Sequence, residues 1–191
     1  IFVGTGPGDP DLLTLGAVAA IAEASAVILD REHLRAMFDH PAVSVGEGVE
    51  IHVLPVQPSG KMLPPSQRAK QVLRYAGEGG RVVRLVSGDP FMDSAVADEA
   101  AACVRGGVDF EVIPGVSHLT AVPEYAGISL NNAGGLHFVS APDRVVKSQA
   151  AQWATQGTLV ISTRAGLLVD AIEAARASGR PDEEPGLVTY F

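Results

Sequence analysis

Short runs rich in β-branched residues alternate along this chain with Ala-rich runs of helical spacing, and this alternation limits the fold most. The strand-like runs at residues 81–86 and 110–113, for example, each precede a run with helical periodicity. Strands that alternate with helices form a largely parallel sheet, because a parallel connection needs a long crossover. The sequence therefore predicts an α/β fold.

The elements fall into two groups along the chain. We expect strands at residues 1–3, 26–29, 49–54, 81–86 and 110–113 and helices at 11–24, 66–76, 92–105 and 117–125. We expect further strands at residues 136–140, 158–162 and 187–191 and a helix at 167–177. These groups predict an N-terminal lobe at 1–127 and a C-terminal lobe at 128–191. The last strand would end the chain with its edge uncovered, so we expect the C-terminal lobe to be incomplete.

Composition excludes several classes of function. The net charge of −8 argues against nucleic acid as a partner, because phosphate binding needs a basic face. No apolar run reaches the roughly 18 residues of a membrane helix. The single cysteine, Cys103, excludes an internal disulfide, and the five histidines show no metal-ligand spacing. We expect a cytoplasmic protein without a metal, and no Ser-His-Asp arrangement is readable.

A glycine-rich loop at residues 4–10 follows the first strand. Glycines there let the backbone turn sharply and approach a ligand closely. One interpretation is a dinucleotide-binding fingerprint, with Asp30 as the acid that binds the ribose. The spacing disfavours it, because Asp9 stands where the last glycine is required and Pro7 lacks a backbone donor. A tight turn between a strand and a helix is the other interpretation.

Two further glycine turns end later strands. Gly88-Asp89-Pro90-Phe91 follows the strand at 81–86, at the strand end where open α/β sheets bind ligands. Asp89 also suits a helix cap, and Pro90 suits a first helical position. Pro114-Gly115 follows the strand at 110–113 and leads to Ser117. Both turns are candidate parts of a binding site.

Taken together, the motifs resemble those of the S-adenosylmethionine (SAM)-dependent tetrapyrrole methylases, closest to the uroporphyrinogen-III branch. The matching segments agree in order and spacing, and they lie at residues 3–14, 81–91, 110–117, 125–130 and 158–161. The resemblance implies two α/β lobes with SAM in the cleft between them, and a homodimer. It implies methyl transfer to a carbon of uroporphyrinogen III or a related tetrapyrrole, in sirohaem or cobalamin biosynthesis.

The resemblance also assigns roles to residues. Asp30, at the end of the second strand, is the candidate base that removes a proton as the ring rearranges, and Arg31 is the candidate partner of a substrate carboxylate. The candidate cofactor-binding residues come from both lobes. They are Pro7, Gly88, Asp89, Pro90, Ser117 and Thr163.

The substrate side departs from the family pattern. Where the family carries cations, this chain has Leu54-Pro55-Val56, Ser94-Ala95-Val96 and Asn131-Asn132-Ala133. A Gly-His pair is replaced by Ala141-Pro142, and a methionine by Thr163. Lys61, Arg35 and His118 are candidate substitutes. One hypothesis is therefore a working methyltransferase with an altered pocket. Another is a diverged, weak or silent domain, such as one fused to uroporphyrinogen-III synthase. An RNA ribose methylase and a nicotinamide dehydrogenase are less favoured.

Overall fold

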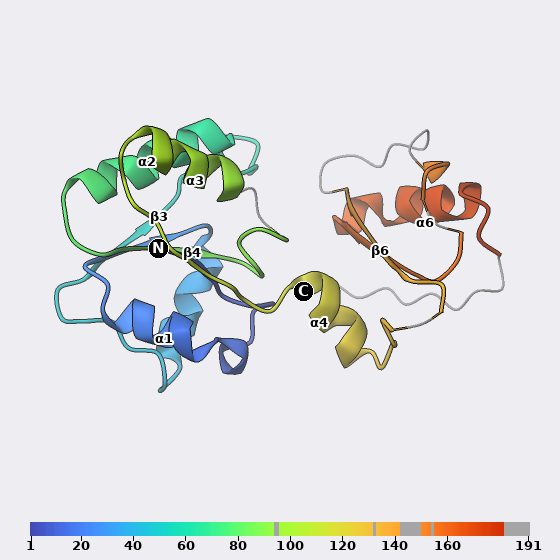
Figure 1. Cartoon of the computed structure of the whole chain (residues 1–191), viewed down its shortest axis with the longest axis horizontal. Coiled ribbons are helices and arrows are strands. Elements are labelled where there is room, and N and C mark those ends of the chain that lie inside the picture. Colours follow the sequence, from blue (N-terminus) through green and yellow to red (C-terminus); the bar gives the residue numbers. More distant parts are fainter. Residues whose placement is uncertain (94–95, 132, 142–149, 154, 182–191) are drawn as a thin grey trace. The chain divides into compact units, whose positions relative to one another are not determined.

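The chain folds into two compact units, Ile1–His118 and Leu119–Phe191, which are called unit 1 and unit 2 (Figure 1). The computed structural model describes residues 1–93, 96–131, 133–141, 150–153 and 155–181. The strand predicted at residues 187–191 lies outside the described residues. The predicted lobe boundary, between residues 127 and 128, falls beyond the division between the two units.

Unit 1 is built on a five-stranded sheet with the strand order β3-β2-β4-β1-β5. Every paired strand runs parallel to its neighbour. The strands are β1 (Phe2–Gly4), β2 (Ala26–Leu29), β3 (Glu50–Val53), β4 (Val82–Val86) and β5 (Val112–Ile113). Their carboxyl ends meet at one edge of the sheet. The mixed α/β architecture and its parallel sheet confirm the predicted fold class.

Helices cover both faces of this sheet (Figure 1). One core layer joins α1 (Leu15–Ala22) and a 3-10 helix (Glu32–Asp39) to strand residues such as Val27 and Leu85. The other joins α2 (Pro65–Gly77) and α3 (Val96–Arg105) to Phe2 and Ile28. Neighbouring strand residues enter opposite layers, since side chains alternate along a strand. Burial on both faces explains why β1, β2 and β4 read as mainly apolar runs.

Some helix boundaries differ from the predicted ones because local hydrogen bonds determine where a helix begins. The helix expected at residues 11–24 is split, because Pro10–Leu12 forms a 3-10 turn and α1 begins only after Thr14. The Thr14 hydroxyl accepts the Ala17 amide at 3.1 Å, which caps the helix. The 3-10 helix at Glu32–Asp39 was not predicted. It contributes Leu34 and Met37 to the core.

Unit 2 contains a parallel pair of strands, β6 (Leu136–Ala141) and β7 (Thr158–Thr163). A helix, α6 (Leu168–Ala177), follows β7 after a short 3-10 turn. The helix α4 (His118–Tyr125) begins at the last residue of unit 1 and continues into unit 2. The observed elements correspond to the strands predicted at 136–140 and 158–162 and to the helix predicted at 167–177.

Candidate functional site

Three glycine turns come into backbone contact at the carboxyl edge of the unit 1 sheet. They begin where β1, β4 and β5 end, and the glycines in contact are Gly4, the last residue of β1, together with Gly88 and Gly115. A Cβ added to Gly4 would lie 2.6 Å from both the Gly88 oxygen and the Gly115 nitrogen. Gly88 also has a φ of 70°, which side-chain-bearing residues rarely adopt. Glycine is therefore required here by packing as well as by conformation.

The first turn is tied directly to the second by two backbone hydrogen bonds. The Gly88 amide donates to the Gly6 oxygen at 2.8 Å, and the Gly6 amide donates to the Gly88 oxygen at 3.2 Å. Pro7, which follows Gly6, is buried. The structure thus brings two of the predicted cofactor-binding positions, Pro7 and Gly88, to the same part of the sheet edge.

Asp89 holds the turn after β4 through both carboxylate oxygens. Its Oδ1 accepts the amides of Phe91 and Met92, each at 2.9 Å. Its Oδ2 accepts the Gly115 amide at 3.3 Å, across the gap to the neighbouring turn. Asp89 therefore fastens the turn at residues 91–92, whereas α3, the helix that it was expected to cap, begins only at Val96. Asp89 also joins two turns that the sequence places far apart. Pro90, the next residue, is buried.

Three residues that the motifs did not single out lie beside these turns. The Asp93 carboxylate accepts the Asp89 amide at 2.7 Å and the Ser117 hydroxyl at 3.0 Å. The His118 Nδ1 lies 3.5 Å from Asp93 Oδ1, and His118 Nε2 lies 3.4 Å from the Ser87 hydroxyl. The sequence showed no Ser-His-Asp arrangement, but the structure brings Ser87, His118 and Asp93 together. The only sequence signal of Ser87 and Asp93 was their place beside a glycine motif, and His118 was singled out only as a candidate substitute for a missing cation.

The electrostatics of Asp93 favour its charged form. Partial burial of Asp93 acts to raise its pKa, but the hydrogen bonds from His118, the Asp89 amide and Ser117 outweigh it. The pKa of this carboxyl is therefore held below its ordinary value. At neutral pH an acceptor with a full negative charge joins the turn after β4 to the turn after β5.

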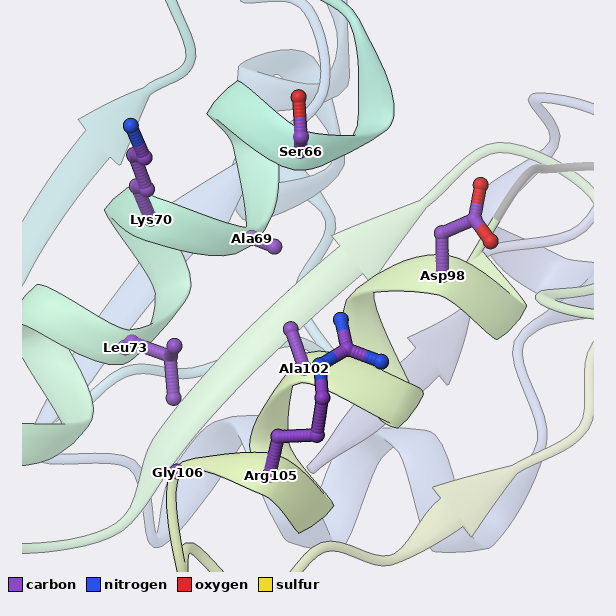
Figure 2. A pocket seen from close by; sticks show the side chains of 8 residues that line it. All are labelled: Ser66, Ala69, Lys70, Leu73, Asp98, Ala102, Arg105 and Gly106. Carbon is purple, nitrogen blue, oxygen red and sulfur yellow. The ribbon is translucent and has the colours of Figure 1, made fainter.

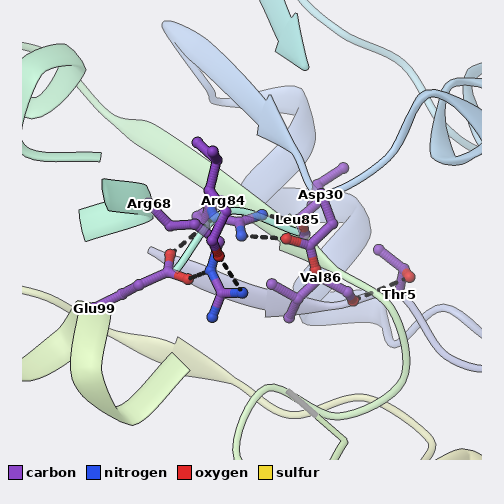
Figure 3. Close-up of polar contacts among 8 residues, drawn as sticks. Thr5, Asp30, Arg68, Arg84, Leu85, Val86 and Glu99 are labelled. Carbon is purple, nitrogen blue, oxygen red and sulfur yellow. Dashed lines mark hydrogen bonds and ion pairs between the residues drawn. The ribbon is translucent and has the colours of Figure 1, made fainter. Parts of the chain in front are cut away.

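Asp30, the candidate base, follows β2 at the same edge and is only 7% exposed. It forms a buried ion pair with Arg84 of β4 (Figure 3). Arg84 also donates from Nε to Glu99 of α3 at 3.1 Å. Glu99 in turn accepts from Arg68 of α2 at 2.7 Å. Arg68, Arg84, Asp30 and Glu99 form a row with equal numbers of positive and negative groups, which is called the buried ionic row below.

The candidate substrate cations have protein contacts of their own. Arg31 donates from one guanidinium nitrogen to the Gly60 oxygen at 3.1 Å, in the loop that precedes α2. Arg35 is paired with Glu32 at 2.7 Å on an exposed stretch of the 3-10 helix. Arg31 therefore lies near the loop that carries Lys61, whereas the charge of Arg35 is largely balanced by its neighbour.

Thr163, the remaining candidate cofactor residue, ends β7 in unit 2. Its hydroxyl donates to the Ala141 oxygen at 2.8 Å, across the parallel pair of strands. The departures at residues 94–95, 132 and 142 lie outside the described residues.

Within the described part of the chain, no three His, Cys, Asp or Glu side chains are grouped to hold a metal ion. No described helix combines the length and apolar character needed to cross a membrane.

A separate pocket of about 550 Å³ opens between α2 and α3 (Figure 2). It is lined by small or apolar residues such as Ala69, Leu73 and Ala102 and by the charged residues Lys70, Asp98 and Arg105. None of the predicted site residues lines it. The chemistry at the strand ends therefore identifies the turns, and not this pocket, as the candidate functional site.

A parallel α/β sheet with glycine turns at its carboxyl edge is typical of α/β proteins that bind small molecules at that edge. The sequence model of the family "Tetrapyrrole (Corrin/Porphyrin) Methylases" matches residues 1–190 of this chain. The chain therefore belongs to the tetrapyrrole methylase family, and this confirms the resemblance found in the motifs.

Individual relatives give the same assignment. An "S-adenosyl-L-methionine-dependent uroporphyrinogen III methyltransferase" of Methanosarcina barkeri is 32% identical over 96% of this chain and 74% of its own length. A siroheme synthase of Azotobacter vinelandii is 35% identical over 73% of this chain. The matched region spans only 30% of that relative's length.

The solved structures include a uroporphyrin III C-methyltransferase of Thermus thermophilus. It is 30% identical to this chain, with a TM-score of 0.68, and the match covers 94% of this chain and 76% of that one. A structure of the same enzyme with S-adenosyl homocysteine has a TM-score of 0.67 at the same identity and coverage. The fold therefore agrees with that of a methyltransferase that binds this product.

Proposed function

We propose that the chain is a SAM-dependent methyltransferase that methylates a carbon of uroporphyrinogen III or of a related reduced tetrapyrrole. The observation that carries the proposal is the contact among the three glycine turns at the carboxyl edge of the sheet. This contact occurs in a chain that belongs to the tetrapyrrole methylases. We also propose a cytoplasmic homodimer, on the resemblance alone.

The fit of the cofactor rests on the shape of the turns. A side chain at Gly4, Gly88 or Gly115 would meet the neighbouring segments, so these glycines let the turns pack closely together at the edge where open parallel α/β sheets bind ligands. Pro7, Asp89, Pro90 and Ser117 stand around the same turns and are proposed to contact the cofactor. On the resemblance alone, Thr163 is proposed as a further cofactor-binding residue.

Carbon methylation requires alignment and a route for a proton. SAM supplies an electrophilic methyl group on a sulfonium and is converted to S-adenosylhomocysteine (SAH) when a pyrrole carbon takes that methyl group. The chain's part is to hold the nucleophile in line, which can lower a barrier by several kcal/mol. The rearranging ring system releases a proton, and Asp30 is the proposed acceptor. Its ion pair with Arg84 holds the carboxylate in one orientation at the end of β2.

A second candidate function is a diverged domain that binds SAM but methylates weakly or not at all. A tetrapyrrole that carries many carboxylates needs several cations, because an unpaired buried carboxylate is costly. Several motif cations are missing from the sequence. Of the candidate replacements, Arg35 is paired with Glu32. We therefore expect turnover of uroporphyrinogen III to be slow or absent relative to a typical family member.

Two measurements on the purified chain separate these candidates. Calorimetric titration with SAH tests the cofactor site, and NAD⁺ is the control ligand because Pro7 and Asp9 spoil a pyrophosphate turn. Transfer of radiolabelled methyl from SAM to uroporphyrinogen III, under anaerobic conditions, tests the reaction. SAH binding with robust methylation supports the first function. Binding without methylation supports the second, and a chain that binds NAD⁺ but not SAH refutes both.

A further inference from the structure

The turn after β4 and the turn after β5 meet at Asp93. The sequence separates these turns by a helix and a strand, so neither can fix the position of the other locally. The Asp93 carboxylate accepts a hydrogen bond from the backbone amide of Asp89 in the first turn and another from the hydroxyl of Ser117 in the second. It also lies 3.5 Å from His118, the residue that follows Ser117. One carboxylate thus gathers donors from both turns.

The side chains of Asp93 and His118 leave no room for a side chain at residue 88. A Cβ added to Gly88 would overlap the Asp93 carboxylate, and it would lie 2.5 Å from His118 Nδ1. The Asp93 and His118 side chains therefore pack directly against the glycine. Removal of either side chain would leave space beside the turn, and the position of Gly88 would no longer be enforced from that side.

The resemblance of Ser87, His118 and Asp93 to a hydrolytic triad does not extend to the groups that such chemistry needs. A nucleophilic serine requires backbone donors aimed at the developing oxyanion. The amides that follow Ser87 are already used. Gly88 donates to the Gly6 oxygen, and Asp89 donates to Asp93. The cluster is therefore suited to holding the turns rather than to attacking an ester.

We propose that Asp93 is a positioning residue for the cofactor, which holds the Gly88 turn and the Ser117 turn at the separation that SAM requires. This inference rests on the proposed function. His118 supports Asp93 by presenting Nδ1 to the same carboxylate. The proposal makes Asp93 important for cofactor affinity although its oxygens are turned toward the protein.

The test is calorimetric titration of SAH into the wild-type chain and into Asp93→Ala, Asp93→Asn and Asp109→Asn variants. A hydrogen bond to a charged group contributes enough that Asp93→Ala should weaken SAH binding by about tenfold to a hundredfold. Asp93→Asn keeps one acceptor oxygen and should lose less. Asp109 is exposed in the loop before β5, so Asp109→Asn is a matched control with unchanged affinity.

Kinetics separate positioning from general damage to the fold. Where methyl transfer is measurable, Asp93→Asn should raise the KM for SAM more than the KM for the tetrapyrrole, and in either case thermal unfolding should show that the variant remains folded. Wild-type binding of SAH together with unchanged affinity in both Asp93 variants would overturn this inference alone. A wild-type chain without measurable SAH binding would overturn the proposed function and this inference with it.

Discussion

Replacement of Glu99 by glutamine tests the buried ionic row most directly. Glu99 is fully buried and accepts from both Arg68 and Arg84. The Glu99→Gln variant keeps the size of the side chain but leaves two buried guanidinium groups with one buried carboxylate in the row, Asp30, which pairs with Arg84. Breaking a buried ion pair costs about 3–5 kcal/mol, because an uncompensated charge remains in the interior. In a unit of this size, about 4 °C of melting temperature corresponds to each kcal/mol. Thermal unfolding of Glu99→Gln should therefore occur about 12–20 °C below the wild type.

An exposed glutamate offers the matched control for this variant. Glu23 lies 3.6 Å from Arg81 on the surface, with 64% of its side chain exposed. An exposed pair contributes roughly 0–1 kcal/mol, so Glu23→Gln should change the melting temperature by less than about 4 °C. A similarly small shift for Glu99→Gln would show that the buried ionic row is solvated, and the reasoning would fail.

A double variant examines the balance of charge within the row. In Arg68→Met/Glu99→Leu, one cation and one anion are removed together, and Arg84 remains paired with Asp30. Because a balanced set replaced by apolar groups is often tolerated, this variant should be more stable than Glu99→Gln alone. Equal or lower stability would mean that packing, and not charge balance, sets the cost.

Three other outcomes are expected. Gly88→Val should abolish SAH binding, measured by calorimetry, because any Cβ at that position overlaps Asp93; retained affinity would place the cofactor elsewhere. If the wild type transfers methyl measurably, Asp30→Asn should remove most of that transfer while SAH affinity stays unchanged, and a fully active variant would exclude Asp30 as the base. Because the pKa of Asp93 is lower in the folded chain, ionisation of Asp93 stabilises the fold at pH values above its unfolded pKa of about 3.8. This contribution is lost as the pH falls through the lower pKa of the folded chain. Acid unfolding should therefore depend less on pH below about 4 in Asp93→Asn, and identical curves would contradict the assignment.

The strands β2 and β4 could be predicted because burial on both faces leaves a strong apolar signal. The range predicted for β2 matches the structure, and that for β4 differs by one residue. The start of α1 was misplaced because the Thr14 cap, and not the apolar periodicity, determines where the helix begins. The 3-10 helix at Glu32–Asp39 was missed because only Leu34 and Met37 are buried in it, too few to give a periodic signal.

The glycines of the candidate site could be predicted, but their supporting side chains could not. A glycine turn after a strand is a local signal, visible in the sequence at Gly88 and Gly115. The hydrogen bond between Asp93 and Ser117 depends on how β4 and β5 are placed in the sheet, which no local pattern records. Arg84 likewise lies within an apolar strand, and its partners come from distant elements.

The pair of hydrogen bonds between Gly6 and Gly88 has a consequence for the thermodynamics of ligand binding. These bonds form an isolated antiparallel bridge between segments that are otherwise turns. A loop that is already ordered before a ligand arrives loses little conformational entropy when it binds. The entropy lost when a ligand binds at this edge should therefore come mainly from the ligand itself. The amide hydrogens of Gly6 and Gly88 should exchange slowly with solvent even in the free chain.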